Sequence, residues 1–240
     1  MSLLPRVLGR VGSFVHRLRA IRRTRGITDP DRLLEFFEQP SPGWIFKPSQ
    51  KRAEIRELFC RVSALRPRRA LEIGTNNGGS LFMFCRAAAS DATLVSIDLP
   101  GGRFGGGYPV IRVPYYLAFA GARQRVRLIR ADSHTPVALA AARRAARGGW
   151  FDFLFIDGDH SYAGVKQDFE MYGPLVRPGG LIAFHDILPA PPELGGGVPQ
   201  FWSDIRERYP TEELVEDRTQ GMMGIGLVHV PELGISPTVV

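Results

Sequence analysis

Short apolar runs alternate with amphipathic stretches through the middle of this 240-residue chain. Five runs are apolar almost throughout and lie at 70–73, 93–97, 126–129, 151–156 and 181–184. Helical periodicity fills several of the intervals between them, at about 79–89, 136–147 and 162–172. Strands that are apolar on both faces and separated by helices are typical of a parallel sheet covered on both sides. The pattern therefore predicts a doubly wound α/β domain.

Both ends of the chain extend this domain. Residues 51–65 have the apolar spacing of a helix, residues 202–209 predict another helix, and residues 213–216 and 224–230 predict two more strands. We therefore place the α/β domain at 51–240. Residues 1–50 are expected to form a basic amphipathic helical arm, followed at 26–50 by an irregular connection rich in proline and aromatic residues.

The arm carries the charge of the chain. The formal net charge is +7, and the first 28 residues alone contain seven arginines and no acidic residue, so the remainder is formally neutral. An enzyme that acts on nucleic acid more often carries its basic surface around the active site. The charge distribution therefore disfavours a nucleic-acid substrate.

Apolar residues recur at helical spacing between these arginines: Leu4, Val7, Leu8, Val11, Phe14, Val15 and Leu18. A helix of this kind can lie on an anionic membrane, or it can pack on its own domain or on a second subunit. Gly9 and Gly12 weaken an isolated helix by about 1 kcal/mol each, which favours packing on protein. Peripheral membrane contact and a homo-oligomer both remain open for the arm.

The chain has no features of a secreted or membrane-spanning protein. Its longest apolar stretches are interrupted well before the roughly 20 residues that a membrane span requires. Arg6 and Arg10 interrupt the N-terminal apolar segment, which disfavours a cleaved signal peptide. Cys60 and Cys85 lie in apolar helical contexts and form neither a metal knuckle nor a disulfide framework. We expect a cytoplasmic protein, which the arm could also hold at the inner face of the membrane.

Polar residues and glycines gather where the predicted strands end, and ligands bind at that edge of a doubly wound sheet. Glycines there let a ligand approach the backbone, and an acid after the second strand can accept both ribose hydroxyls of a nucleoside. A single acid at such a place is often only the N-cap of the following helix. Polar residues at four strand ends together are less easily explained as helix caps alone. The candidate cofactor-binding residues are Glu72, Gly74, Thr75, Asn76, Asn77, Gly78, Ser80, Asp98, Asp132, Ser133 and Asp157.

Together these motifs resemble the class I S-adenosylmethionine-dependent methyltransferases. The resemblance is carried by residues 72–74, Asp98, residues 131–133, the run 151–160 and the turn 175–180. More narrowly, residues 104–107, 156–160 and 184–187 are similar to a bacterial subgroup that includes antibiotic-sugar O-methyltransferases and cephalosporin-hydroxylase-like proteins. The match covers about 69–230 and leaves the arm aside.

The resemblance implies a Rossmann-like sheet of seven mostly parallel strands, with the arm as an N-terminal helical extension. It also implies S-adenosylmethionine as the cofactor. Glu72, Gly74 and Gly78 would shape the methionine and ribose end of its site, Asp98 would hold the ribose hydroxyls, and the Asp–Ser pair at 132–133 would hold the adenine. Many relatives have a further glycine where this chain has Thr-Asn-Asn at 75–77, and the Asn amides could donate to the cofactor carboxylate.

Methyl transfer to a hydroxyl needs an oriented acceptor and a group that takes its proton. Adjacent strands lie about 4.8 Å apart, so the residues that follow the fourth and fifth strands should face one another. His160 is the candidate base because its ordinary pKa suits proton removal at neutral pH, and Asp159 is its rival. The alternative for His160 is a hydrogen-bonded residue at a helix start with no part in catalysis.

A divalent cation lies between these two strand ends in relatives with the same arrangement. Carried over to this chain, its ligands would be Asp157, His185 and Asp186. Many relatives have an acid or an amide in place of His185. Since Mg²⁺ prefers oxygen ligands, the histidine leaves Mg²⁺, Mn²⁺ and the absence of a metal all open.

We therefore expect an O-methyltransferase that acts on a sugar, a glycolipid or another small natural product. The glycine-rich segments 100–108 and 195–197 would flank the acceptor pocket. Five aromatic residues could line this pocket or belong to the core: Tyr108, Tyr115, Tyr116, Phe201 and Trp202. An NAD-dependent oxidoreductase of Rossmann type is the alternative, although the dinucleotide fingerprint is missing. A non-catalytic protein that has the same fold and binds S-adenosylmethionine is a second alternative.

Overall fold

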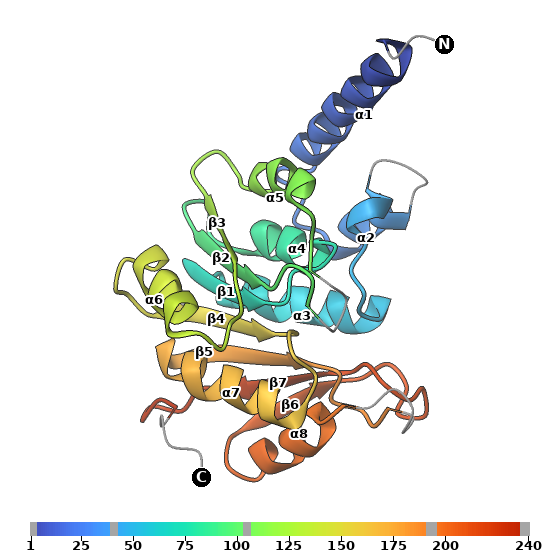
Figure 1. Cartoon of the computed structure of the whole chain (residues 1–240). Coiled ribbons are helices and arrows are strands. Elements are labelled where there is room, and N and C mark those ends of the chain that lie inside the picture. Colours follow the sequence, from blue (N-terminus) through green and yellow to red (C-terminus); the bar gives the residue numbers. More distant parts are fainter. Residues whose placement is uncertain (1–3, 39–42, 103–106, 191–195, 236–240) are drawn as a thin grey trace.

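A seven-stranded sheet runs through the molecule and has helices on both faces (Figure 1). The computed structural model describes residues 4–38, 43–102, 107–190 and 196–235. The strand order is β3-β2-β1-β4-β5-β7-β6; β7 is antiparallel to β5 and to β6, and the other strand pairs are parallel. The strands are β1 (Arg69–Ile73), β2 (Thr93–Asp98), β3 (Arg125–Arg130), β4 (Phe151–Ile156), β5 (Val176–His185), β6 (Thr211–Leu214) and β7 (Ile225–His229). The doubly wound α/β class and the mostly parallel sheet are confirmed.

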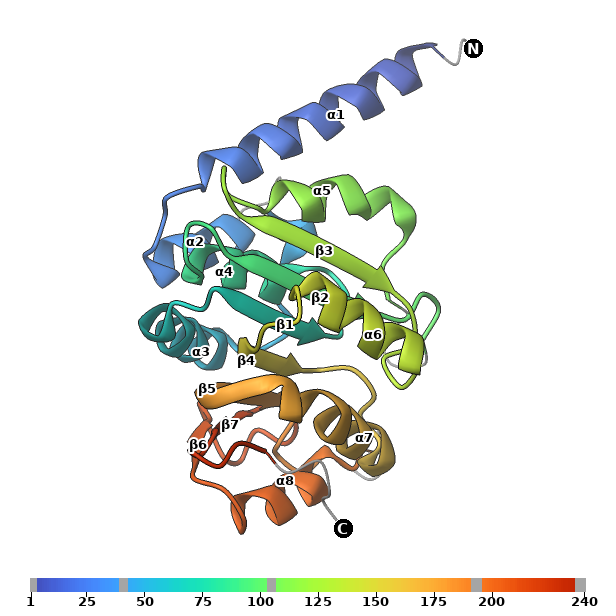
Figure 2. The ribbon, with the colours of Figure 1, turned by 90° about the vertical axis from the view of Figure 1, so that its left-hand side faces the viewer.

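Two groups of helices cover the sheet (Figure 2). Helices α2 to α5 pack on one face, and α6 to α8 pack on the other. The helices are α1 (Leu4–Arg23), α2 (Pro30–Glu38), α3 (Arg52–Leu65), α4 (Gly79–Ala87), α5 (Val113–Ala118), α6 (Pro136–Ala145), α7 (Tyr162–Tyr172) and α8 (Val198–Arg206). Short 3-10 helices lie at Trp44–Phe46, Val110–Arg112 and Gly173–Leu175.

Two details of the predicted elements were wrong, and one helix was not predicted. The connection at 26–50 is not irregular, because it contains α2 and the short helix Trp44–Phe46. The interval before β3, for which no helix was predicted, contains α5, a helix too short for its periodicity to stand out. Helix α8 starts at Val198, directly after Gly197, with a proline in its first turn that favours a helix start.

The central strands are apolar throughout because both of their faces are buried. On β4, Phe153 and Phe155 join the hydrophobic cluster under α2–α5, whereas Leu154 and Ile156 join the cluster under α6–α8. This is the alternation that the two-residue period of a strand requires. Each fully buried side chain of this size contributes about 1.5–3 kcal/mol, so the two clusters hold the layers together.

Helix α1 projects from the body in both views (Figures 1 and 2). Its C-terminal part is docked on the body: Ile21 is fully buried, and the Phe14 ring lies 5.0 Å from that of Tyr115 in α5. Among the described residues, none of the helices combines the length and the apolar composition that crossing a bilayer demands.

Candidate active site

The register of the parallel strands brings four residues to one edge of the sheet. Ile73 pairs with Ile97 on one side and with Ile156 on the other, and Ile156 pairs with Phe184. The next residues along the chain are Gly74, Asp98, Asp157 and His185, so they lie side by side where the four strands end. The edge predicted to bind the cofactor is thus assembled by the pairing of β2, β1, β4 and β5.

The turn after β1 requires glycine at two positions. Gly74 has φ +88°, and a Cβ there would lie 1.9 Å from the carbonyl oxygen of Asp157. Gly78 has φ +83°, and a Cβ there would lie 2.7 Å from the Tyr116 ring. Both conformations are ones that other residues rarely adopt. The two glycines therefore let the turn pass close to β4 and α5.

Asp98 holds this turn in place. Its side chain is buried, and its Oδ2 accepts the backbone N–H groups of Thr75 and Asn76, both at 2.7 Å. Burial raises the pKa of Asp98, and the two N–H groups oppose that rise. The backbone of Gly107 passes close to the other carboxylate oxygen of Asp98. A Cβ on Gly107 would lie only 2.3 Å from this Oδ1. One carboxylate oxygen thus serves the loop, and the other faces the strand-end edge.

Glu72 is a second buried acid at this edge. Its Oε1 accepts the hydroxyl of Ser80 at 2.5 Å, and its buried Oε2 has no hydrogen-bond partner among the described residues. Burial raises the pKa of Glu72 to about 8. The hydroxyl of Thr75 shares a short hydrogen bond with that of Ser96. An acceptor atom without a partner here leaves room for a donor from a ligand.

The two asparagines of the turn are partly engaged. The backbone carbonyl oxygen of Asn76 accepts a hydrogen bond from the Tyr116 hydroxyl at 2.6 Å, while the Asn76 side chain is exposed. The Oδ1 of Asn77 accepts the Arg112 guanidinium at 2.9 Å. The exposed Asn76 amide is therefore the one of the pair that a ligand reaches most easily.

Asp132 and Ser133 follow β3, as predicted, at the next strand end of the edge. The Oδ1 of Asp132 accepts the N–H of His134 at 2.9 Å, and the carbonyl of Ser133 accepts the Tyr172 hydroxyl at 2.7 Å. His134 lies 3.3 Å from the fully buried Asp168 of α7. The loop is thereby tied to α7, and both predicted residues remain half-buried and within reach of a ligand.

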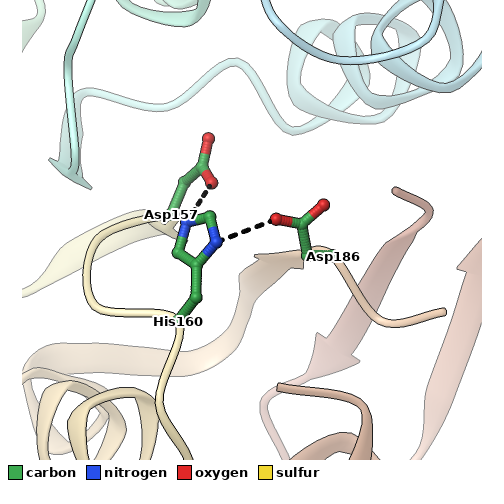
Figure 3. A group of neighbouring side chains, drawn as sticks. All are labelled: Asp157, His160 and Asp186. Carbon is green, nitrogen blue, oxygen red and sulfur yellow. Dashed lines mark ion pairs between the residues drawn. The ribbon is translucent and has the colours of Figure 1, made fainter. Parts of the chain in front are cut away.

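A histidine stands between two carboxylates where β4 and β5 end (Figure 3). The Nδ1 of His160 lies 3.0 Å from Oδ2 of Asp186, and its Nε2 lies 3.5 Å from Oδ1 of Asp157. The Nδ1 of His185 lies 3.1 Å from the same oxygen of Asp157 and 3.4 Å from Oδ1 of Asp186. The structure thus brings the predicted base and the predicted metal ligands into one cluster.

Charge in this cluster keeps His160 protonated. Burial lowers the pKa of His160, but its contacts with Asp157 and Asp186 outweigh burial and raise the pKa to about 10. Burial likewise raises the pKa of Asp157, and the two histidines outweigh it and lower the pKa to about 2. As folded, His160 is therefore a cation at neutral pH, and it can act as a base only when the carboxylates are engaged elsewhere.

The same cluster has the donor atoms of a metal site. One atom each of Asp157, His160 and Asp186 lie within 4.8 Å of one another. His185, the predicted nitrogen ligand, points Nδ1 at Asp157, and its buried Nε2 has no partner among the described residues. Two carboxylates with an imidazole suit Mn²⁺ better than Mg²⁺, because Mg²⁺ prefers oxygen ligands. His160 is therefore a second candidate for the nitrogen ligand.

Asp159 lies apart from this cluster. Its Oδ1 accepts the N–H of Ser161 at 2.8 Å, and a Cβ on Gly164 would lie 2.3 Å from its carboxyl carbon. The Asp159 carboxylate therefore sits over the first turn of α7, where negative charge is favourable. This placement is that of a helix-start residue and gives no support to Asp159 as the rival base.

Sequence reasoning missed one residue of the cluster. The side-chain amide of Gln50 donates to Oδ2 of Asp157 at 2.8 Å, and Gln50 is buried. The contact spans 107 residues of sequence, and Gln50 belongs to no periodic segment. A lone glutamine before a helix gives no signal of such a role.

The aromatic residues considered for the acceptor pocket lie in the core. Each is at most 6% exposed: Tyr108, Tyr115, Tyr116, Phe201 and Trp202. The three tyrosines belong to one hydrophobic cluster, whereas Phe201 and Trp202 belong to the cluster on the opposite face. The core interpretation is therefore correct. Of the glycine-rich segments, residues 103–106 and 195 lie outside the described residues.

Comparison with known proteins agrees with this geometry. A family model described as a methyltransferase domain matches residues 71–187. The y4gI protein of Sinorhizobium fredii is 32% identical over 165 residues, which are 68% of this chain and 18% of that protein. The caffeoyl-CoA O-methyltransferase of Populus kitakamiensis is 30% identical over 135 residues, 56% of this chain and 53% of that one. This chain thus spans about half the length of that enzyme and a smaller share of y4gI.

Solved structures share the fold. The O-methyltransferase TomG of Streptomyces achromogenes, in complex with S-adenosylmethionine, has a TM-score of 0.57 at 19% identity and covers 85% of this chain and 89% of its own. The MycE methyltransferase, in complex with Mg, S-adenosylhomocysteine and mycinamycin VI, has a TM-score of 0.50 at 21% identity and covers 84% of this chain and 54% of its own. The sheet order, the glycine turn and the matched family model lead to one conclusion: residues 71–187 form a domain of the class I S-adenosylmethionine-dependent methyltransferases.

Proposed function

We propose that this protein transfers the methyl group of S-adenosylmethionine to a hydroxyl of a sugar, a glycolipid or another small natural product, with help from a divalent cation. One observation carries the proposal. The cluster of Asp157, His160 and Asp186, drawn in Figure 3, follows β4 and β5, and the register of these strands with β1 places it at the same sheet edge as the glycine turn. Proton-removing and metal-binding groups thus stand beside the site that the family uses for its cofactor.

The residues of this edge fit S-adenosylmethionine. Glu72 offers a buried oxygen without a partner, which suits an ammonium group such as that of the cofactor's methionine part. Asp98 offers a carboxylate oxygen beside Gly107, where no Cβ blocks an approaching ribose. When bound, the cofactor supplies a methyl group on a sulfonium, which is the electrophile of the reaction.

The donor set also fits a divalent cation. Asp157 and Asp186 would hold it, with His160 or His185 as the nitrogen ligand. A cation there would lower the pKa of the acceptor hydroxyl and fix its position. MycE, whose structure contains Mg, shares this fold, and the caffeoyl-CoA O-methyltransferase shares sequence with this chain.

His160 is the residue that takes the acceptor proton in this scheme, with His185 as the nitrogen ligand. Of the two imidazole nitrogens of His160, Nε2 has the longer contact, 3.5 Å to Oδ1 of Asp157. This contact is therefore the easier of the two to break. Asp157 and Asp186 now keep the imidazole protonated. If these carboxylates shared their charge with a cation, the pKa of His160 would fall, its proton would leave to solvent, and the neutral imidazole could then accept the proton of the acceptor hydroxyl. Gln50 keeps Asp157 oriented through the other carboxylate oxygen.

Transfer from labelled S-adenosylmethionine to hydroxyl probes tests the proposal. A catechol and a methyl glycoside with neighbouring hydroxyls would serve as acceptors. We expect a methylated product from at least one probe, loss of transfer in EDTA, and recovery on addition of Mn²⁺ or Mg²⁺.

The Asp186→Asn variant should lose most of the transfer, because it removes a charged ligand from the cluster. Asp91→Asn, an exposed acid that precedes β2, is the matched control and should retain it. Methyl transfer that persists in EDTA would refute the proposed role of a divalent cation. If a protein that binds the cofactor forms no product with any hydroxyl probe, the proposed transfer to hydroxyls is wrong.

A further inference from the structure

The docked end of the arm is densely basic. Arg17, Arg19, Arg22, Arg23 and Arg25 lie within nine residues, and all but Arg17 are classed as exposed. Among the described residues, none of these five side chains pairs with a carboxylate. The positive charge of these five arginines is thus not neutralised by a carboxylate of the described part of the chain.

A depression continues this charge where the arm joins the body. It has a volume of about 710 Å³ and lies between the segment after α1, the end of α4 and the turn before β3. Its charged lining residues are Arg25, Arg66, Arg86 and Arg123, and no acid lines it. Burial, together with the nearby charge of Arg25, lowers the pKa of Arg86 to about 10. The depression is therefore lined by positive charge without a compensating acid.

This basic surface lies away from the cofactor edge. The depression is lined by residues that precede β2 and β3, whereas the site residues follow the strands. A partner on the depression therefore leaves the cofactor edge accessible. Figure 2 shows the arm leaving the body beyond β3 and α5.

The body fixes the direction of the arm. The buried guanidinium of Arg86 donates to the carbonyl of Ile21 at 3.3 Å and to the hydroxyl of Thr24 at 3.0 Å, so it caps the end of α1. Arg86 also donates to the carbonyl of Phe119, next to α5. A cation at a helix C-terminus stabilises that helix. The arm is thus held as a fixed projection from the body.

The arm is also amphipathic. Phe14, Leu18 and Ile21 pack on the body, and the sequence continues the same spacing of three and four residues back to Val11, Val7 and Leu4. Arginines flank this apolar stripe. An apolar stripe with basic flanks is what binds a helix to the interface of an anionic bilayer.

We infer that α1 and the arginine-lined depression form a docking surface for an anionic lipid membrane. Two copies of an arm that has seven arginines and no acid repel each other, which disfavours pairing between arms. Nucleic acid would match the charge but leave the apolar stripe unused. An anionic membrane matches both, because its phosphate headgroups would meet the arginines and its acyl boundary would take the N-terminal part of the stripe, at Val11, Val7 and Leu4, beyond the residues that pack on the body.

Co-sedimentation of the full chain with vesicles tests this surface. Phosphatidylcholine vesicles with phosphatidylglycerol would be compared with pure phosphatidylcholine vesicles at low and high salt. The wild type should bind only the anionic vesicles and be released by high salt. R19Q/R22Q/R23Q changes exposed residues only and should weaken binding about a hundredfold, from roughly fivefold per arginine near the surface.

The matched control removes the same charge from α6. R143Q/R144Q/R147Q also changes exposed residues and should bind like the wild type. R66Q/R123Q, at the depression, should weaken binding about twentyfold by the same reasoning. Unchanged binding of the arm variant, an equal loss in the α6 control, or equal binding to both kinds of vesicle would overturn the inference. Arm-dependent binding to duplex DNA without binding to anionic vesicles would overturn it in favour of a nucleic-acid partner.

Discussion

Asp98 is the residue whose removal tests the cofactor edge most sharply. Its Oδ2 accepts the N–H groups of Thr75 and Asn76 at 2.7 Å, and its other oxygen lies beside Gly107. Asp98→Ala removes both functions. Asp98→Asn keeps the size and one acceptor oxygen but removes the charge.

The expected loss follows from the bonds that Asp98 makes. A hydrogen bond to a charged group contributes about 1.5–3 kcal/mol. Two ribose hydroxyls on the carboxylate would therefore contribute about 3–6 kcal/mol, which corresponds to a factor of roughly 10² to 10⁴ in the dissociation constant. The two N–H groups also lose their acceptor. The burial that raises the pKa of Asp98 offsets part of their contribution, so we expect a loss of only about 2 kcal/mol in the free energy of unfolding.

Calorimetric titration with S-adenosylhomocysteine measures this directly, because the product analogue binds without turnover. Asp98→Ala should bind roughly 10² to 10⁴ times more weakly than the wild type, and Asp98→Asn should fall between them. Asp91→Ala, an exposed acid on the same segment of chain, should bind normally. An Asp98→Ala variant that unfolds cooperatively and binds within about threefold of the wild type would refute the assignment of Asp98 to the ribose.

Three further predictions concern the metal cluster, the glycine turn and a buried ion pair. Asp186→Asn should abolish calorimetric Mn²⁺ binding while the wild type binds it, and equal binding by both would place the metal elsewhere. Gly74→Ala puts a Cβ 1.9 Å from the carbonyl oxygen of Asp157 and should lower the free energy of unfolding in urea by about 3–5 kcal/mol. An unchanged urea midpoint would contradict the described geometry of the turn after β1. The carboxylate of Asp168, 3.3 Å from the imidazole, is the largest cause that raises the pKa of His134 to about 9, so the stabilisation from this pair is complete below pH 6.5 and is lost as the pH rises through 9. In Asp168→Asn, an NMR titration should find the pKa of His134 back near 6.5, and a value still near 9 would show that Asp168 is not the cause.

The sheet and its functional edge were predictable because their signals are local. The apolar strands of a covered parallel sheet, and the acids and glycines that follow them, are visible in short windows of sequence. The helices missed were of two kinds. Helix α5 is too short for periodicity, and α2 lies among prolines and aromatic residues that are typical of irregular segments.

The arrangement of the candidate site was harder to predict than its composition. The register of β4 and β5 brings His160 between Asp157 and Asp186, and the approach of two carboxylates turns the predicted base into a cation. Gln50 reaches the same carboxylate from a distant segment, which only tertiary packing decides. Asp159 is adjacent to His160 in sequence, yet it faces the first turn of α7.

Binding of the cofactor to the purified wild-type protein tests the central claim most directly. Calorimetric titration would use S-adenosylmethionine, S-adenosylhomocysteine and, for comparison, NAD⁺. The structure predicts saturable binding of the first two compounds at one site and no binding of NAD⁺. Binding of NAD⁺ without binding of the two methionine derivatives would contradict the methyltransferase account and require another role for Glu72, Asp98 and the cluster around His160.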